Sequence, residues 1–331
     1  MHRPGLSAVV PCYNEAESLP ELYRRLNAAC HAACGDDFEI VLVDDGSTDT
    51  TWKLISDMSQ QDARVVAVKL ARNHGHQIAL SAGLELCTGQ RVFVIDADLQ
   101  DPPELLTPML QKIEDGADVV YGQRTERKGE TWFKRLTAAG FYRILDRLVE
   151  TKIPRDTGDF RLMDRKVLDV LLDMPERHRF IRGMVAWIGF DQVAYPYIRD
   201  ERYAGETKYP LRAMLRLSAD AITGFSVKPL RIASFLGVLT AMASILLIAY
   251  SLISWMFFTT VSGWTSLIIV ILVLSSVQLL VLGVIGEYLG RLVIEAKHRP
   301  MFIIDRVIVD GKESAPQTRI AHSIGRDRAG R

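Results

Sequence analysis

Residues 92–104, VFVIDADLQDPPE, decide the fold class and the first chemical expectation for this chain. The four leading residues are apolar and suit a buried β-strand, which would end directly before Asp96 and Asp98. Two carboxylates placed in this way can hold a divalent cation, because Mg²⁺ typically takes one or two protein carboxylates and fills its other positions with water and substrate phosphates. Gln100 offers a further oxygen. The alternative for a short acidic run is a solvated loop.

Three similar segments precede this one, and each is a short apolar run followed by polar residues and then by helical spacing of apolar residues. The four strands are expected at 6–10, 40–43, 65–70 and 92–95. Strands that alternate with helices predict an α/β fold with a mostly parallel sheet and helices on its faces. Asn14 is expected to cap the first helix.

The overall composition limits the partners and the compartment to be expected for this chain. The 331 residues carry 40 basic and 40 acidic side chains, and this balance argues against a nucleic-acid partner. The four cysteines show neither metal-ligand spacing nor a disulfide framework, so reduced thiols in a cytosolic environment are expected. The first residues lack the apolar run of a signal peptide.

The segment 232–286 contains no Asp, Glu, Lys or Arg. One membrane helix needs about 20 apolar residues, so this segment predicts a transmembrane hairpin with spans at about 232–257 and 265–286. Basic residues flank both ends, whereas the connecting loop is uncharged, and this places both ends in the cytoplasm. The alternative is a buried hairpin in a soluble protein.

The polar clusters all follow the carboxyl ends of predicted strands, where ligands bind in open α/β sheets. We therefore expect them to converge on one crevice. No Gly-x-Gly-x-x-Gly fingerprint follows the first strand and no Walker loop occurs, so a dinucleotide or P-loop site is not expected.

Five motifs carry a family resemblance: PCYNE at 11–15, DDGS at 44–47, RN at 72–73, DADLQDPPE at 96–104 and GDF at 158–160. Their order and spacing resemble the family-2 glycosyltransferases with the GT-A, Rossmann-like fold. Together with the two spans, the chain as far as about Arg299 is similar to polyprenol-phosphate glycosyltransferases such as bactoprenol glucosyltransferase and dolichol-phosphate mannose synthase.

The resemblance also implies roles for individual residues. It implies nucleotide binding by Pro11, Tyr13, Glu15, Asp44, Asp96 and Ala97, Mg²⁺ or Mn²⁺ binding by Asp96, Asp98 and Gln100, and lipid phosphate binding by Arg124, Arg202 and Lys208. It implies catalytic roles for Asp98 and Asp159. Asp159 takes the position of a base, but a phosphate monoester with a second pKa of about 6 needs little deprotonation, so Asp159 could instead orient a substrate or hold Arg161.

The implied activity is inverting transfer of one sugar, with UDP-glucose as the favoured donor, to polyprenyl (undecaprenyl) phosphate at the cytoplasmic face of a bacterial inner membrane. GDP-mannose, a modified UDP-sugar, or a non-catalytic membrane adaptor remain alternatives. A processive polysaccharide synthase would carry a Gln-x-x-Arg-Trp element and more spans, and neither occurs here. Self-association of the membrane spans into a homo-oligomer is expected.

The expected organisation has three parts. Residues 1–226 form the cytoplasmic catalytic domain, in which 131–149 and 209–225 have the basic amphipathic pattern of helices lying at a membrane surface. Residues 227–290 form the hairpin, and 291–331 form a cytoplasmic tail. In this tail a strand is expected at 301–309, and the polar residues 310–331 are expected to be disordered.

Overall fold

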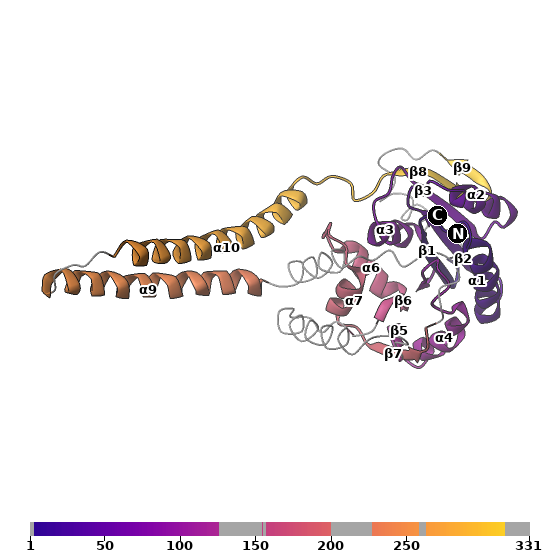
Figure 1. The fold of residues 1–331 in the computed structure, drawn as a ribbon. Helices are drawn as coiled ribbons and strands as arrows, with labels where there is room; N and C mark the ends of the chain where they lie inside the picture. Colours follow the sequence, from indigo (N-terminus) through magenta and orange to yellow (C-terminus); the bar gives the residue numbers. More distant parts are fainter. Residues whose placement is uncertain (1–2, 126–153, 155–156, 200–226, 258–262, 315–331) are drawn as a thin grey trace. The chain divides into compact units, whose positions relative to one another are not determined.

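The computed structural model describes residues 3–125, 154, 157–199, 227–257 and 263–314. The described chain forms two compact units (Figure 1). The first holds every described strand together with the shorter helices, and the second holds the two long apolar helices that precede the last strands.

The first unit is organised around a nine-stranded sheet. In spatial order its strands are β7 (Gln192–Tyr197), β5 (Val119–Arg124), β6 (Thr157–Asp164), β4 (Arg91–Val94), β1 (Leu6–Cys12), β2 (Phe38–Asp44), β3 (Val65–Leu70), β8 (Ile304–Val309) and β9 (Lys312–Ser314). Strands β4, β1, β2 and β3 are parallel, as are β5 and β7, whereas β6 and β8 run antiparallel to their neighbours. The predicted mostly parallel α/β sheet is confirmed.

Helices cover both faces of this sheet. Their bounds are α1 (Leu19–Cys34), α2 (Thr51–Gln61), α3 (His76–Leu86), α4 (Leu106–Glu114), α6 (Arg165–Asp173) and α7 (Ile181–Ile188), with a short 3₁₀ helix η1 (Pro103–Leu105) before α4. Helices α1, α2 and α4 pack on one face, and α3, α6 and α7 on the other (Figure 1). Strands β1 and β2 are consequently buried along their whole length, which explains their unbroken apolar sequences.

Glycine at position 83 lets α3 lie close to the sheet. A Cβ at this position would lie 2.5 Å from Val9 Cγ1 and 3.0 Å from Val43 Cγ2. The helix that follows β3 is thereby held against the two central strands, and its first residues are held at the carboxyl edge of the sheet, which we define as the loops that follow β1, β2, β3 and β4.

The strand expected at 301–309 is present as β8 and pairs antiparallel with β3. Residues 312–314 lie in the stretch expected to be disordered, but they form β9. Asp310 and Gly311 connect the two strands, both with positive φ, at 52° and 69°. A two-residue Asp-Gly connection of this kind favours a tight hairpin, and that local signal explains the difference from the prediction.

The second unit is an apolar helical hairpin. Helices α9 (Lys228–Phe257) and α10 (Trp264–Ala296) lie side by side (Figure 1). Each is long and apolar enough to cross a membrane, with mean hydropathy of 2.3 over Lys228–Tyr250 and 2.6 over Ile269–Ala296. The two predicted helices are present, and α10 continues past the predicted end at 286.

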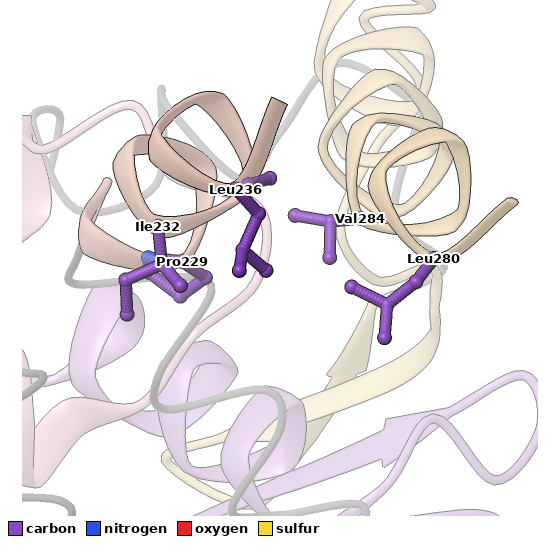
Figure 2. A pocket seen from close by; sticks show the side chains of 6 residues that line it. Pro229, Ile232, Leu236, Leu280 and Val284 are labelled. Atoms are coloured by element: carbon purple, nitrogen blue, oxygen red, sulfur yellow. The ribbon is translucent and has the colours of Figure 1, made fainter. Parts of the chain in front are cut away.

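Apolar side chains form a small cavity between the two helices (Figure 2). Its volume is about 180 Å³, and it is lined by Pro229, Ile232, Ala233, Leu236, Leu280 and Val284. The cavity lies near the first turns of α9, and its lining offers no polar group to a ligand.

Candidate functional site

The loops after β2 and β3 interlock at the carboxyl edge. The two carboxylate oxygens of Asp45 accept hydrogen bonds from the backbone amides of His74, at 2.7 Å, and Gly75, at 2.9 Å. Gly46 has φ of 67°, and a Cβ there would lie 2.5 Å from the carbonyl carbon of Arg72. Glycine is required for this approach, which fixes the two loops against each other.

Asn14 joins the loops after β1 and β2. Its backbone amide donates to Ser47 Oγ at 3.0 Å, and its side-chain oxygen accepts from the Thr48 amide at 2.9 Å. Helix α1 begins at Leu19, with Ser18 in the N-cap position, so the prediction that Asn14 caps this helix is wrong. The asparagine side chain stabilises the contact between loops instead.

The predicted nucleotide residues of these two loops differ in their surroundings. The Tyr13 ring is exposed, whereas Asp44 is fully buried. Burial raises the pKa of Asp44, although its Oδ1 accepts a 3.2 Å hydrogen bond from the Ser47 amide. Its second oxygen, Oδ2, is buried and has no hydrogen-bond partner in the described part of the chain. Glu15 accepts a 2.7 Å hydrogen bond from Ser18 Oγ.

The chain turns sharply after β4. Leu99 has φ of 58°, and the Gln100 amide donates to Asp98 Oδ1 at 3.2 Å. A positive φ is unfavourable for leucine, and the burial of this side chain holds the turn. The side chains of Ala97 and Pro11 are also buried, so only their backbone atoms can meet a nucleotide.

His76, which the sequence analysis did not select, lies between two of the predicted site residues. Its Nε2 is 3.5 Å from Asp96 Oδ1 and 3.2 Å from Asp159 Oδ2. Burial lowers the pKa of His76, but the two carboxylates outweigh this effect and raise it to about 9. Burial raises the pKa of Asp96 to about 6, against the opposing charge of His76. The structure therefore brings Asp96 and Asp159 together around one imidazolium.

Gln77 is the second residue that the sequence analysis missed. Its Nε2 donates to Asp159 Oδ2 at 2.5 Å, and its Oε1 accepts from the Ile181 amide at 2.9 Å. The acceptor, the Asp159 carboxylate, lies on β6, and the donor, the Ile181 amide, lies at the first residue of α7. One amide side chain thus connects three elements of the first unit.

Asp159 is an ionised carboxylate in this arrangement. Burial favours its neutral form, but the hydrogen bond and charge of His76, with the charges of Arg161 and Arg182, hold its pKa well below the usual range. Arg161 in turn donates to the backbone carbonyls of Asp159, at 3.2 Å, and Gly158, at 3.1 Å. A carboxylate stabilised in this way is a weak base, so this environment favours the orienting role considered for Asp159 over that of a base.

Arg124, one of the predicted phosphate ligands, belongs to a polar cluster at the end of β5. Its Nε donates to Tyr197 Oη at 3.4 Å, and its Nη2 is 3.9 Å from Asp101 Oδ1. Tyr197 Oη donates to the same oxygen of Asp101. Arg199 Nε lies 3.5 Å from that oxygen, and Arg199 Nη2 lies 4.0 Å from Asp98 Oδ2. Asp101, Tyr197 and Arg199 were not selected from the sequence.

Several predicted features lie outside the described residues. They are the phosphate ligands Arg202 and Lys208 and the amphipathic segments 131–149 and 209–225. Within the described residues, no group of three or more His, Cys, Asp or Glu side chains is arranged to hold a metal ion. The predicted metal ligands are two carboxylates and one amide, which is a different kind of group. The metal site therefore stays a prediction.

Comparison with known proteins gives the following matches. Residues 7–172 match the model of glycosyl transferase family 2. The chain is 49% identical over 301 residues to the uncharacterized glycosyltransferase YkcC of Bacillus subtilis (strain 168), covering 91% of this chain and 93% of that protein. It is 39% identical over 300 residues to the bactoprenol glucosyl transferase of Shigella phage SfV, covering 90% and 97%.

Among solved structures, the mannosyltransferase PcManGT of Pyrobaculum calidifontis, in complex with GDP-Man and Mn²⁺, is 17% identical with a TM-score of 0.43. The match covers 87% of this chain and 88% of that one.

Proposed function

Because the chain belongs to glycosyl transferase family 2, we propose that it transfers one sugar from a nucleotide-sugar to polyprenyl phosphate at the cytoplasmic face of a membrane. UDP-glucose is the favoured donor. The observation that carries this proposal is the 39% identity to a bactoprenol glucosyl transferase over 90% of the chain. The uncovered tenth is too short to contain the apolar hairpin, so the similarity extends over both units.

In this proposal the nucleotide binds to the loops after β1, β2 and β4. The exposed ring of Tyr13 offers a face for the base, and Asp44 offers a buried oxygen without a hydrogen-bond partner in the described residues. A buried acceptor of this kind gains stability from a ligand N–H, because an unpaired buried polar group costs about 1–3 kcal/mol. Pro11, Glu15, Asp96 and Ala97 complete the proposed contacts.

A divalent cation, Mg²⁺ or Mn²⁺, is proposed to bind Asp96, Asp98 and Gln100. The donor set fits such an ion, because all three residues offer hard oxygen ligands within one turn. Asp96 Oδ1 is buried and makes no hydrogen bond among the described residues, and its neighbour at 3.5 Å is His76 Nε2. When bound, the cation would offset the charge that develops on the departing nucleotide diphosphate.

The acceptor is proposed to be a lipid phosphate because the second unit suits a bilayer. Helix α9 has 30 residues and α10 has 33. At about 1.5 Å per residue, each exceeds the hydrocarbon thickness of about 30 Å. Lys228 and Arg231 precede the apolar run and Arg291, Lys297 and Arg299 follow it. Positive charge at both ends supports the proposal that these ends, and the first unit, lie in the cytoplasm.

The proposed reaction is a single displacement with inversion. A phosphate oxygen of the acceptor forms a bond to the anomeric carbon, while the bond from this carbon to the diphosphate oxygen breaks. The acceptor phosphate is largely dianionic near pH 7, so the nucleophile needs no strong base. Asp159 would then orient a substrate, and Arg124, Arg202 and Lys208 would bind the acceptor phosphate.

The test is nucleoside diphosphate release by the purified full-length protein. A panel of UDP- and GDP-sugars is supplied with Mg²⁺ or Mn²⁺, with and without undecaprenyl phosphate. Release that requires both the cation and the lipid, and that is fastest with UDP-glucose, is the expected result. If a donor binds but no condition gives release, the chain acts as a non-catalytic adaptor and the proposal fails.

A further inference from the structure

Asp101 is a buried carboxyl side chain that contacts three side chains at the carboxyl edge. It is 0% exposed, and its Oδ1 accepts from Tyr197 Oη and faces two guanidinium groups, with Arg199 Nε at 3.5 Å and Arg124 Nη2 at 3.9 Å. Two positive charges therefore meet one buried carboxylate. The second oxygen, Oδ2, is buried and has no hydrogen-bond partner in the described part of the chain.

The backbone places the two arginines beside each other. Arg124 ends β5 and is paired in register with Tyr197, which ends the neighbouring parallel strand β7. Arg199 follows two residues later. Gly158 leaves room for this arrangement, because a Cβ at that position would lie 2.8 Å from Arg124 Nη2. Gly122 acts similarly for the Tyr197 ring, whose Cε1 would lie 2.8 Å from an added Cβ.

Charge and exposure distinguish this cluster from an ordinary ion pair. One arginine is sufficient to neutralise a buried carboxylate, and a second buried charge adds desolvation cost. The side chains of Arg124 and Arg199 are nevertheless 23% and 27% exposed, so both guanidinium groups keep part of their surface available. Arg199 Nη2 is also 4.0 Å from Asp98, the proposed metal ligand. Arg199 thus lies beside the proposed reaction centre.

We propose that Arg199 forms a two-arginine phosphate-binding site with Arg124, and that Asp101 and Tyr197 are positioning residues that hold the two guanidinium groups together. The inference rests on the proposed function and extends it to residues outside the predicted site. The planar fork of each guanidinium matches phosphate oxygens, and two forks can bind one phosphate group from two directions.

The ligand is a phosphate group of a substrate, and two substrates carry one. The acceptor carries a monophosphate on a polyprenyl chain, whereas the donor carries a diphosphate on a nucleoside. Both substrates present phosphate oxygens, which are the groups that the two arginines are proposed to bind. The experiment therefore uses one probe of each kind. Farnesyl phosphate represents the acceptor, UDP with Mg²⁺ represents the donor, and farnesol serves as the same chain without phosphate.

Binding of the three probes is measured by titration calorimetry on the full-length protein in detergent. The variant Arg199→Gln removes the charge and the fork, and Arg199→Lys keeps the charge but removes the fork. Arg25→Gln is the matched control, because Arg25 is likewise a partly exposed arginine in an ion pair, with Glu104 at 2.7 Å and a 24% exposed side chain, and it has no part in the proposed site. Thermal unfolding of each variant reports folding.

The expected result is that Arg199→Gln raises the Kd of at least one phosphate probe about tenfold, in keeping with the loss of a charge-assisted pair of hydrogen bonds, while Arg25→Gln changes it less than twofold. Arg199→Lys should lie between the wild type and Arg199→Gln. Loss confined to farnesyl phosphate assigns the site to the acceptor, and loss confined to UDP assigns it to the donor.

Two outcomes would overturn the inference. One is that both phosphate probes bind folded Arg199→Gln, or Arg199→Lys if the first variant unfolds, within twofold of the wild type. The other is that farnesol loses affinity by the same factor as farnesyl phosphate, because the effect would then not depend on phosphate. A wild-type protein that binds no probe and releases no nucleotide contradicts the proposed function itself, and this result is separate from the variant comparison.

Discussion

Gln77 Nε2 donates a 2.5 Å hydrogen bond to Asp159 Oδ2. The same side chain accepts from the Ile181 amide, so its amide group fixes the carboxylate on β6 relative to the start of α7. The surrounding cations stabilise the negative charge of Asp159, and the hydrogen bond from Gln77 fixes the orientation of its carboxylate. The orientation of Asp159 therefore depends on a residue outside the family motifs quoted above.

Replacement of Gln77 by methionine tests this relationship, because methionine keeps a similar volume and removes both hydrogen bonds. A hydrogen bond to a charged group is worth about 1.5–3 kcal/mol, which corresponds to a fall in kcat of roughly 10- to 100-fold if the bond orients the reacting groups. The KM for the sugar nucleotide should change little. Steady-state kinetics with varied donor at saturating lipid measures both constants.

Gln111→Met provides the control for this variant. Gln111 Nε2 also donates to an aspartate, Asp115, at 3.4 Å, but on the exposed side of α4. The control should keep wild-type kcat. Equal kcat values for Gln77→Met and Gln111→Met would show that the contact with Asp159 does not serve the reaction.

His76 should make the stability of the protein depend on pH. Its pKa is raised from 6.5 to about 9, so the stability that its positive charge contributes is fully present below pH 6.5 and is lost as the pH rises through 9. The depressed pKa of Asp159 acts only at acid pH, outside this window. Thermal unfolding between pH 6.5 and 9.5, without divalent cation, should show a larger fall in Tm for the wild type than for His76→Asn. Equal falls in Tm for the two proteins would show that the positive charge of His76 does not stabilise the fold.

Gly158→Ala should displace Arg124 without unfolding the protein. The added Cβ would lie 2.8 Å from Arg124 Nη2, which is the end of a flexible side chain and can move away. We expect a several-fold rise in the KM for polyprenyl phosphate, because a phosphate ligand would lose its alignment with one guanidinium. Gly237→Ala is the control, since no atom of the described residues lies within 4 Å of an added Cβ there. An unchanged KM would show that Arg124 does not bind the acceptor phosphate.

Asp98→Asn should remove the dependence of turnover on divalent cation. One charged ligand is lost, and with it much of the stabilisation of the leaving diphosphate, so kcat should fall at least about 100-fold. Asp115→Asn is the control. Asp115 is an exposed aspartate at the end of α4, far along the sequence from the proposed metal residues, so this variant should behave as the wild type. Activity of Asp98→Asn that responds to Mg²⁺ like the wild type would refute the metal assignment.

The sequence predicts the four central parallel strands and β8 because their signal is local. Apolar runs such as 65–70 correspond to strands that are buried on both faces, and β3 has the same bounds as predicted. The two apolar helices are also local features, since each is a long segment without charge. Asp96 and Asp98 could be selected because they follow a strand directly.

The contacts of the site could not be predicted in the same way. His76 and Gln77 meet Asp159 across 83 and 82 residues of sequence, and this contact depends on how closely α3 packs against the sheet. Arg199 becomes significant only when β7 is placed beside β5, at the end of the sheet. Neither pairing leaves a pattern in a single sequence, because a polar residue at the start of a helix or after a strand also occurs in ordinary loops.

The most direct test of the account is identification of the lipid product. Purified full-length protein is incubated with UDP-glucose, Mg²⁺ and undecaprenyl phosphate, and the extracted lipids are analysed by mass spectrometry. We predict a new lipid with the mass of undecaprenyl monophosphate plus one hexose residue, formed by the wild type and not by Asp98→Asn. Free glucose and UDP without any glycosylated lipid, or no reaction with any sugar nucleotide, would contradict it.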